Sequence, residues 1–152
     1  MWVRSGLGVA LVALLTSCSH IVVLHDPLGA AEHNDLGVSY ERDGETELAA
    51  REYRRALRVD PHFARARVNL GNLEAAANRW TEAEVHYRRA LQDAADDPDA
   101  LNNLAYALLR RGRNLAEAEA LAARAVRSGG PRESLYRETL ADIRRARGIP
   151  AN

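Results

Sequence analysis

Apolar and small residues recur along most of the chain with a fixed spacing of 34 residues. The motif LGVSY begins at Leu36, LGNLE begins at Leu70, and the related LAYAL begins at Leu104. The same order of small and aromatic positions follows the first two motifs: Ala49, Tyr53 and Ala56, then Ala83, Tyr87 and Ala90. A period of about 20–50 residues is typical of arrays in which each unit buries its apolar side against the next. The pattern therefore predicts stacked repeats over about residues 29–148.

The spacing within one unit is L-G-x2-Y, then A-x3-aromatic-x2-A, then a proline at Pro61. This order resembles the tetratricopeptide repeat (TPR). The resemblance implies an all-α solenoid of antiparallel helix pairs across residues 30–148, with a short tail at 149–152. Three repeats would be followed by a capping helix near Arg132–Arg147, whose outer face carries charged residues. We therefore expect seven helices.

In such a helix pair, small residues mark the places where the two helices come closest. Gly37, Gly71 and Ala105 occupy matching positions on the first helix, where a side chain larger than a methyl group would push the helices apart. The complementary small positions on the second helix are Ala49, Ala83 and Ala118. Residues that accept a left-handed backbone stand between the two helices; they are Gly44, Asn78 and Gly112.

The third unit departs from the pattern in three ways. It needs one extra residue near 114–115, and Ala122 replaces its aromatic residue, so we expect thinner packing there. Pro98 also comes three residues later than Pro61 predicts, which indicates a longer or shifted junction between the second and third units. We expect Asp97 and Pro98 to open the third unit.

The N-terminus carries Arg4 and then the run from Gly6 to Leu15, which is apolar or small. This run matches the roughly 7–15 residues of a signal h-region and is shorter than the roughly 20 residues of a membrane-spanning helix. The sequence LTSC that ends at Cys18, the only cysteine, resembles the lipobox of bacterial lipoproteins. The resemblance implies a signal peptide over residues 1–17 and an acylated Cys18 that begins a lipidated N-terminus and linker over residues 18–29.

An acylated Cys18 would hold the protein at a membrane, since two or three acyl chains bind firmly where one does not. Ser19 in place of aspartate favours the outer membrane and a domain that faces the periplasm. An ordinary signal peptide cleaved nearby is the alternative. The apolar Ile21–Leu24 segment could cap the first repeat, add a strand to a partner, or lie at the membrane surface, and the sequence does not decide among these.

Composition and charge narrow the function. The 21 basic and 21 acidic residues nearly cancel, which argues against a nucleic-acid partner, and one cysteine excludes a disulfide within the chain. No nucleophile context, phosphate-binding glycine loop or metal-ligand spacing is present, so we expect no enzyme, cofactor, metal or small-molecule substrate. His20, His25, Asp26 and His33 lie within one short segment that could meet a transition metal, but exposure in a linker is the simpler interpretation.

The resemblance also implies that the first helices of the repeats line a concave face that binds a protein or peptide. Asparagine suits this role because its side chain offers a donor and an acceptor to a peptide backbone. Asp99 and Leu135 stand where a carboxylate clamp would need basic residues, so a C-terminal carboxylate ligand is disfavoured. The predicted partner-binding residues are Asn34, Asp35, Val38, Arg42, Arg65, Asn69, Asn72, Asn102, Asn103, Tyr106 and Arg110.

Arginines crowd the second helices and could form a basic stripe that contacts anionic lipid; the set is Arg51, Arg54, Arg55, Arg58, Arg88 and Arg89. Glu47 precedes Arg51 by four residues and Glu84 precedes Arg88 by four, an order that favours helical ion pairs. We therefore expect a solvated face of paired charges.

Together these patterns predict a membrane-anchored TPR lipoprotein that acts as a protein–protein interaction adaptor or scaffold in the bacterial cell envelope. Two alternatives remain open. The protein could be a pilotin-like or barrel-assembly-like factor for an outer-membrane machine, or an accessory subunit of an envelope hydrolase.

Overall fold

The computed structural model describes residues 26–149, and every regular element within them is an α-helix. The predicted seven helices are confirmed: α1 (Ala30–Arg42), α2 (Thr46–Val59), α3 (Ala64–Ala76), α4 (Trp80–Asp93), α5 (Pro98–Arg110), α6 (Leu115–Ser128) and α7 (Glu133–Ala146). Cys18, the signal peptide and residues 18–25 of the predicted linker lie outside the described residues. Across residues 26–149 no helix combines the length and the apolar character that crossing a bilayer needs.

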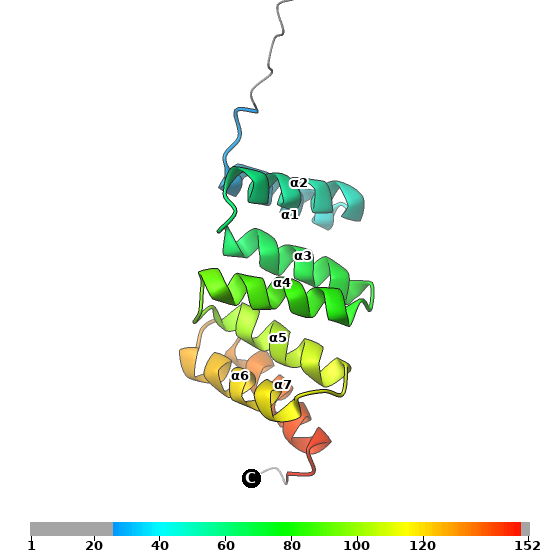
Figure 1. The fold of residues 1–152 in the computed structure, drawn as a ribbon, viewed down its shortest axis with the longest axis vertical. Coiled ribbons are helices and arrows are strands. Elements are labelled where there is room, and N and C mark those ends of the chain that lie inside the picture. Colours follow the sequence, from blue (N-terminus) through cyan, green and yellow to red (C-terminus); the bar gives the residue numbers. More distant parts are fainter. Residues whose placement is uncertain (1–25, 150–152) are drawn as a thin grey trace, which may run out of the picture.

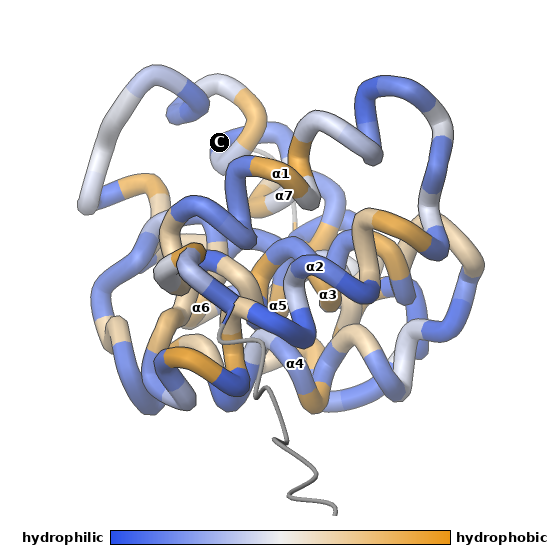
Figure 2. The backbone as a smooth tube through the Cα atoms, turned by 90° about the horizontal axis from the view of Figure 1, so that it is seen from above, coloured by the Kyte–Doolittle hydropathy of each residue, from blue (hydrophilic) through white to orange (hydrophobic). Residues whose placement is uncertain are grey.

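The helices stack as three pairs, α1 with α2, α3 with α4 and α5 with α6, and α7 covers the last pair (Figure 1). The first helices begin at Ala30, Ala64 and Pro98, so the 34-residue sequence period is also the structural period. Seen along the stack, polar and apolar stretches alternate along the helices (Figure 2). Each pair packs against the next pair, and the last pair packs against α7.

The close approach of paired helices depends on glycine more strictly than the sequence suggested. A Cβ atom built on Gly37 would lie 2.5 Å from Cε1 of Tyr53, and one on Gly71 would lie 2.5 Å from Cε1 of Tyr87. Even a methyl group would therefore collide with the ring. The third repeat can carry Ala105 because Ala122 takes the place of the tyrosine.

The predicted turn residues adopt the left-handed backbone, with φ of 80° at Gly44, 59° at Asn78 and 62° at Gly112. Asn114 has a φ of 51° and stands immediately before α6. It lengthens the third turn by one residue, which confirms where the extra residue lies.

The junction between the second and third units was expected to be longer or shifted; the longer alternative is wrong, and the shift concerns the proline alone. The segments 60–63 and 94–97 that join successive repeats have the same length. Pro61 lies in the turn before α3, whereas Pro98 is the first residue of α5, where its missing N–H and fixed φ suit a helix start. Asp97 caps this helix by accepting a hydrogen bond from the Ala100 backbone N–H at 2.9 Å.

The buried core falls into two main clusters. The first joins α2 to α3 through Ala49, Tyr53, Ala56, Ala66, Leu70 and Leu73. The second runs from Val68 of α3 to Ile143 of α7 and includes Ala105 and Ala122. Ile143 is fully buried in this cluster, so the capping helix contributes a large side chain beside the small residues of the third repeat.

Candidate functional site in the concave groove

The first helices of the three repeats are joined by asparagine side chains. Asn69 Nδ2 donates to Asn34 Oδ1 at 2.8 Å, which joins α3 to α1. Asn103 Nδ2 donates to Asn72 Oδ1 at 2.9 Å, which joins α5 to α3. The Tyr87 hydroxyl donates to the same Asn72 oxygen at 2.9 Å. Some of the asparagines that the sequence predicted to bind a partner therefore have a structural role, because their amides hold neighbouring repeats in register.

Burial separates the structural amides from those that a partner can reach. Asn34 is fully buried and Asn102 is 3% exposed, whereas Asn69, Asn72 and Asn103 are half-buried. Each of these three keeps a polar group with no hydrogen-bond partner in residues 26–149: a side-chain oxygen on Asn69 and Asn103, and the side-chain NH₂ on Asn72. A peptide backbone has the matching donors and acceptors.

Three hollows follow one another along this face. The first, of about 210 Å³, includes Val38 and Arg65; the second, of about 270 Å³, includes Trp80; the third, of about 350 Å³, includes Leu135. Asn72 and Asn103 line both the first and the second, and Asn103 and Tyr106 line both the second and the third. The three form one surface from α1 to α7, which we call the concave groove.

An aromatic cluster lies in the C-terminal half of the concave groove. The rings of Trp80 and Tyr106 meet edge to face, with centroids 5.7 Å apart. The Arg110 guanidinium lies 4.6 Å from the Trp80 ring and donates to the Tyr106 hydroxyl at 3.2 Å. The sequence predicted Tyr106 and Arg110 but missed Trp80, which begins α4 and contacts the next repeat. Leu135, 45% exposed, adds an apolar side chain at this end.

The charges of the groove are distributed unevenly. Arg65 is exposed and forms no ion pair within the described part of the chain. Asp99 instead accepts hydrogen bonds from Arg132 and, at 2.6 Å, from the Tyr136 hydroxyl. Burial, together with this bond, raises the pKa of Tyr136 to about 12. Asp99 is thus occupied, and Arg65 is a cation of the groove that can meet an acidic group of a ligand.

Four predicted partner-binding residues do not line these hollows: the buried Asn34, Arg110 of the aromatic cluster, Asp35 and Arg42. Asp35 is exposed and accepts a long hydrogen bond of 3.4 Å from Asn34, and Arg42 is exposed at the end of α1. Neither lines the three hollows that form the concave groove.

The histidines differ from the sequence interpretation. His33 is not exposed in a linker: it lies in α1, is 1% exposed, and places Nδ1 2.8 Å from Glu52 Oε2 and Nε2 3.2 Å from Asp26 Oδ2. His20 and His25 lie outside the described residues. Within residues 26–149 no three histidine, cysteine or carboxylate side chains are grouped as metal ligands.

The arginines of the second helices are only partly paired. Arg88 contacts Glu84 at 2.8 Å, as predicted, but Arg51 forms no ion pair with Glu47. Arg55 contacts Glu52 at 2.8 Å. The arginines of this face that have no ion pair in the described part of the chain are Arg51, Arg54, Arg58 and Arg89.

A family model described as tetratricopeptide repeat matches residues 34–98 and 84–133. The chain belongs to the tetratricopeptide-repeat family. No curated protein sequence matches it. Solved structures with the TPR fold are similar to most of this chain, and three of them are described next.

The first TPR domain of Spaghetti, bound to the HSP90 peptide SRMEEVD, is 18% identical, with a TM-score of 0.71 over 78% of this chain and 93% of that one. Pseudomonas aeruginosa pilF is 26% identical, with a TM-score of 0.70. The match covers 81% of this chain but only 55% of pilF. The Yersinia enterocolitica type III secretion translocator chaperone SycD is 20% identical, with a TM-score of 0.68 over 78% of this chain and 86% of that one.

Proposed function

We propose that this TPR protein is a non-catalytic adaptor that binds an extended segment of a partner protein in the concave groove. The observation that carries the proposal is the row of half-buried amides at Asn69, Asn72 and Asn103 along one continuous surface. Amides spaced along such a groove can hydrogen-bond a backbone whatever its side chains are, while Arg65 and the Trp80 cluster select among side chains. The Spaghetti domain, which has the same fold, binds a peptide.

Photo-crosslinking in intact cells tests this proposal. A photoreactive amino acid is placed at position 69 or 103 and, as a matched control, at Val85, which is 45% exposed on α4 and lies outside the groove. We expect one partner to be crosslinked from 69 and from 103 and not from 85. Identical products from all three positions would contradict a specific groove.

The second part of the proposal is the location. The LTSC sequence supports a lipoprotein whose acylated Cys18 holds the repeats at the bacterial outer membrane, facing the periplasm. A labelled fatty acid should be incorporated into the wild type and into Ser19→Ala, but not into Cys18→Ala. An unlabelled wild type would remove the anchor and leave the groove proposal intact.

A second candidate is a more specialised role as an assembly factor for an envelope machine. The similar fold of SycD, described as a secretion translocator chaperone, favours it. Purification of the protein with its partners from membranes separates the two candidates. An assembly factor should return one secretin or barrel component, whereas a general scaffold should return a mixture.

A further inference from the structure

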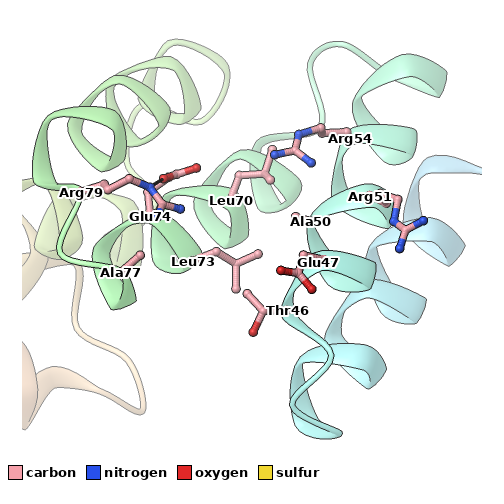
Figure 3. Close-up of a pocket in the computed structure, with 10 residues that line it drawn as sticks. All are labelled: Thr46, Glu47, Ala50, Arg51, Arg54, Leu70, Leu73, Glu74, Ala77 and Arg79. Atoms are coloured by element: carbon pink, nitrogen blue, oxygen red, sulfur yellow. Dashed lines mark hydrogen bonds and ion pairs between the residues drawn. The ribbon is translucent and has the colours of Figure 1, made fainter.

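A second hollow lies outside the concave groove, lined by α2, α3 and the turn that leads from α3 into α4 (Figure 3). Its volume is about 550 Å³, which exceeds that of each hollow in the concave groove. This size is within the range of about 300–1,000 Å³ that is typical of ligand sites. Four apolar side chains line it: Ala50 from α2, and Leu70, Leu73 and Ala77 from α3 and its C-cap.

The rim of this hollow carries three arginines, Arg51, Arg54 and Arg79, and two glutamates, Glu47 and Glu74, so one positive charge is left over. Arg51 and Arg54 project from α2 and form no ion pair among residues 26–149. Arg79, on the opposite side, pairs with Glu74. An apolar floor next to two unpaired guanidinium groups complements a ligand that is both apolar and acidic.

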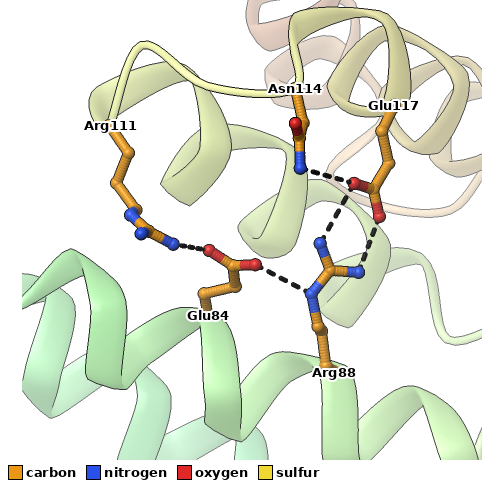
Figure 4. Close-up of polar contacts among 5 residues, drawn as sticks. All are labelled: Glu84, Arg88, Arg111, Asn114 and Glu117. Carbon is orange, nitrogen blue, oxygen red and sulfur yellow. Dashed lines mark hydrogen bonds and ion pairs between the residues drawn. The ribbon is translucent and has the colours of Figure 1, made fainter.

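The hollow lies at the first junction, between the first and second repeats. At the second junction, between the second and third repeats, ion pairs close the corresponding position. At a spacing of 34 residues, Glu84 corresponds to Ala50, Arg88 to Arg54, and Arg111 to Ala77. Glu84 accepts hydrogen bonds from Arg88 at 2.8 Å and from Arg111 (Figure 4). Arg88 also donates to both oxygens of Glu117, at 2.6 and 3.0 Å, and these bonds raise its pKa further. The chain's own ion pairs thus bridge α4 to α6.

The first junction lacks these bridges for a simple reason. Ala50 and Ala77 are too short to cross from one helix to the next, so the hollow stays open. Arg54 occupies the position of Arg88 and Glu82 that of Glu117, but no ion pair joins Arg54 to Glu82 in residues 26–149. The missing partner has a defined chemistry: a carboxylate for the arginine and an aliphatic side chain for the leucine floor.

We propose that the hollow between α2 and α3 is a second docking site, and that it binds a segment of a partner protein with an aliphatic side chain next to Asp or Glu. The aliphatic group lies over Leu70 and Leu73, and the carboxylate accepts hydrogen bonds from Arg54 and Arg51. The site is separate from the concave groove, so a ligand could occupy both.

The test sorts a displayed library of short random peptides against the whole protein and against a filled variant, Ala50→Glu with Ala77→Arg, which copies the second junction. Peptides that prefer the wild type should carry Leu, Ile or Val beside Asp or Glu. The filled variant, and separately Arg54→Gln, should weaken them about tenfold or more, since a charge-assisted hydrogen bond is lost. Circular dichroism should show an unchanged helical fold.

Two further variants sharpen the result. Glu84→Ala with Arg111→Ala should open the second junction and add a weaker second site for the same peptides. Tyr106→Ala with Leu135→Ala alters the concave groove at exposed side chains far from this hollow and should leave peptide binding unchanged, which separates this proposal from the adaptor function.

Three outcomes would overturn the proposal. One is that no peptide distinguishes the wild type from the filled variant, and another is that the peptides that do are basic. The third is that phosphatidylglycerol vesicles bind the wild type and the filled variant equally but not Arg51→Glu with Arg54→Glu, and no peptide distinguishes them. That result would assign the arginines to a lipid surface instead of a protein segment.

Discussion

At the scale of single residues, a glycine and a tyrosine set how closely the helices of the first and second repeats approach. Alanine usually stabilises a helix over glycine by about 0.5–1 kcal/mol. At position 71 its Cβ would lie 2.5 Å from the Tyr87 ring. The overpacking, at about 1–3 kcal/mol, should exceed the helix preference.

We therefore predict that Gly71→Ala lowers the free energy of unfolding, measured by denaturant titration with circular dichroism. Ala105→Gly in the third repeat should also be destabilising, because Ala122 replaces the ring there and leaves alanine its helix preference. The second repeat thus favours glycine at this position and the third favours alanine. In the Tyr87→Ala background, the penalty of Gly71→Ala should disappear. An equal penalty with and without the ring would disprove the steric explanation.

Two histidines should titrate on opposite sides of the ordinary pKa of 6.5. His62 Nδ1 lies 2.7 Å from Asp93 Oδ1, and this hydrogen bond raises the pKa of His62. Burial lowers the pKa of His86, whose Nδ1 has no hydrogen-bond partner in the described residues. Two-dimensional NMR of the imidazole protons measures both pKa values, and the variants His62→Gln and His86→Gln assign the signals. A pKa of His86 above that of His62 would refute the prediction.

The two shifts have opposite effects on stability. Below a pH of about 6.5 the unfolded chain binds a proton at His86 more readily than the folded chain, so this group destabilises the fold as the pH falls and has no such effect well above 6.5. His62 instead stabilises the fold at pH values below 6.5, and its contribution is lost as the pH rises through its raised pKa.

At the scale of the helix, α5 is the one member of the seven described helices whose N-cap side chain accepts a backbone hydrogen bond. Asp97→Ala should destabilise the protein by about 0.5–2 kcal/mol. Asp97→Asn should retain most of the stability, because its side-chain oxygen still accepts the bond. Glu45→Ala, at the N-cap of α2 where no such bond exists, is the control for denaturant unfolding. Equal losses at both caps would contradict this role.

The fold was predictable from the sequence because its determinants are local and steric. The glycine and tyrosine positions, the left-handed turns at Gly44 and Asn78, and the cap at Asp97 each act within one repeat or one turn. The extra residue at Asn114 was visible for the same reason. The longer junction was a wrong inference because Pro98 moved into the helix without changing the period.

The site was only partly predictable because it depends on how repeats face each other. The sequence placed Asn34 on the concave face, but only the structure shows that it is buried against Asn69. Trp80 reaches Tyr106 across a repeat boundary, and the open hollow depends on Ala50 and Ala77, which lie on different helices. Such juxtapositions follow from the superhelical stacking, which no local pattern encodes.

At the scale of the whole molecule, the division of the core predicts a gradient of stability. The first cluster joins α1 and α2 to α3, and the second runs from α3 to α7; Leu70 of α3 belongs to the first and Val68 to the second. In a stack of repeats, each unit is stabilised mainly by its neighbours. The α1–α2 pair has one neighbouring repeat, so it can open while the second cluster stays packed.

Native-state hydrogen exchange should therefore show that amides of α1 and α2 open at a lower free energy than those of α5. Tyr53→Ala should reduce protection in α1 and α2 while sparing α5, because its ring lies only in the first cluster. Ile143→Ala should reduce protection in α5 to α7 instead, since it leaves a cavity in the second cluster worth about 2–5 kcal/mol. If both variants lowered protection uniformly, the repeats would unfold as one cooperative unit, which would contradict this gradient.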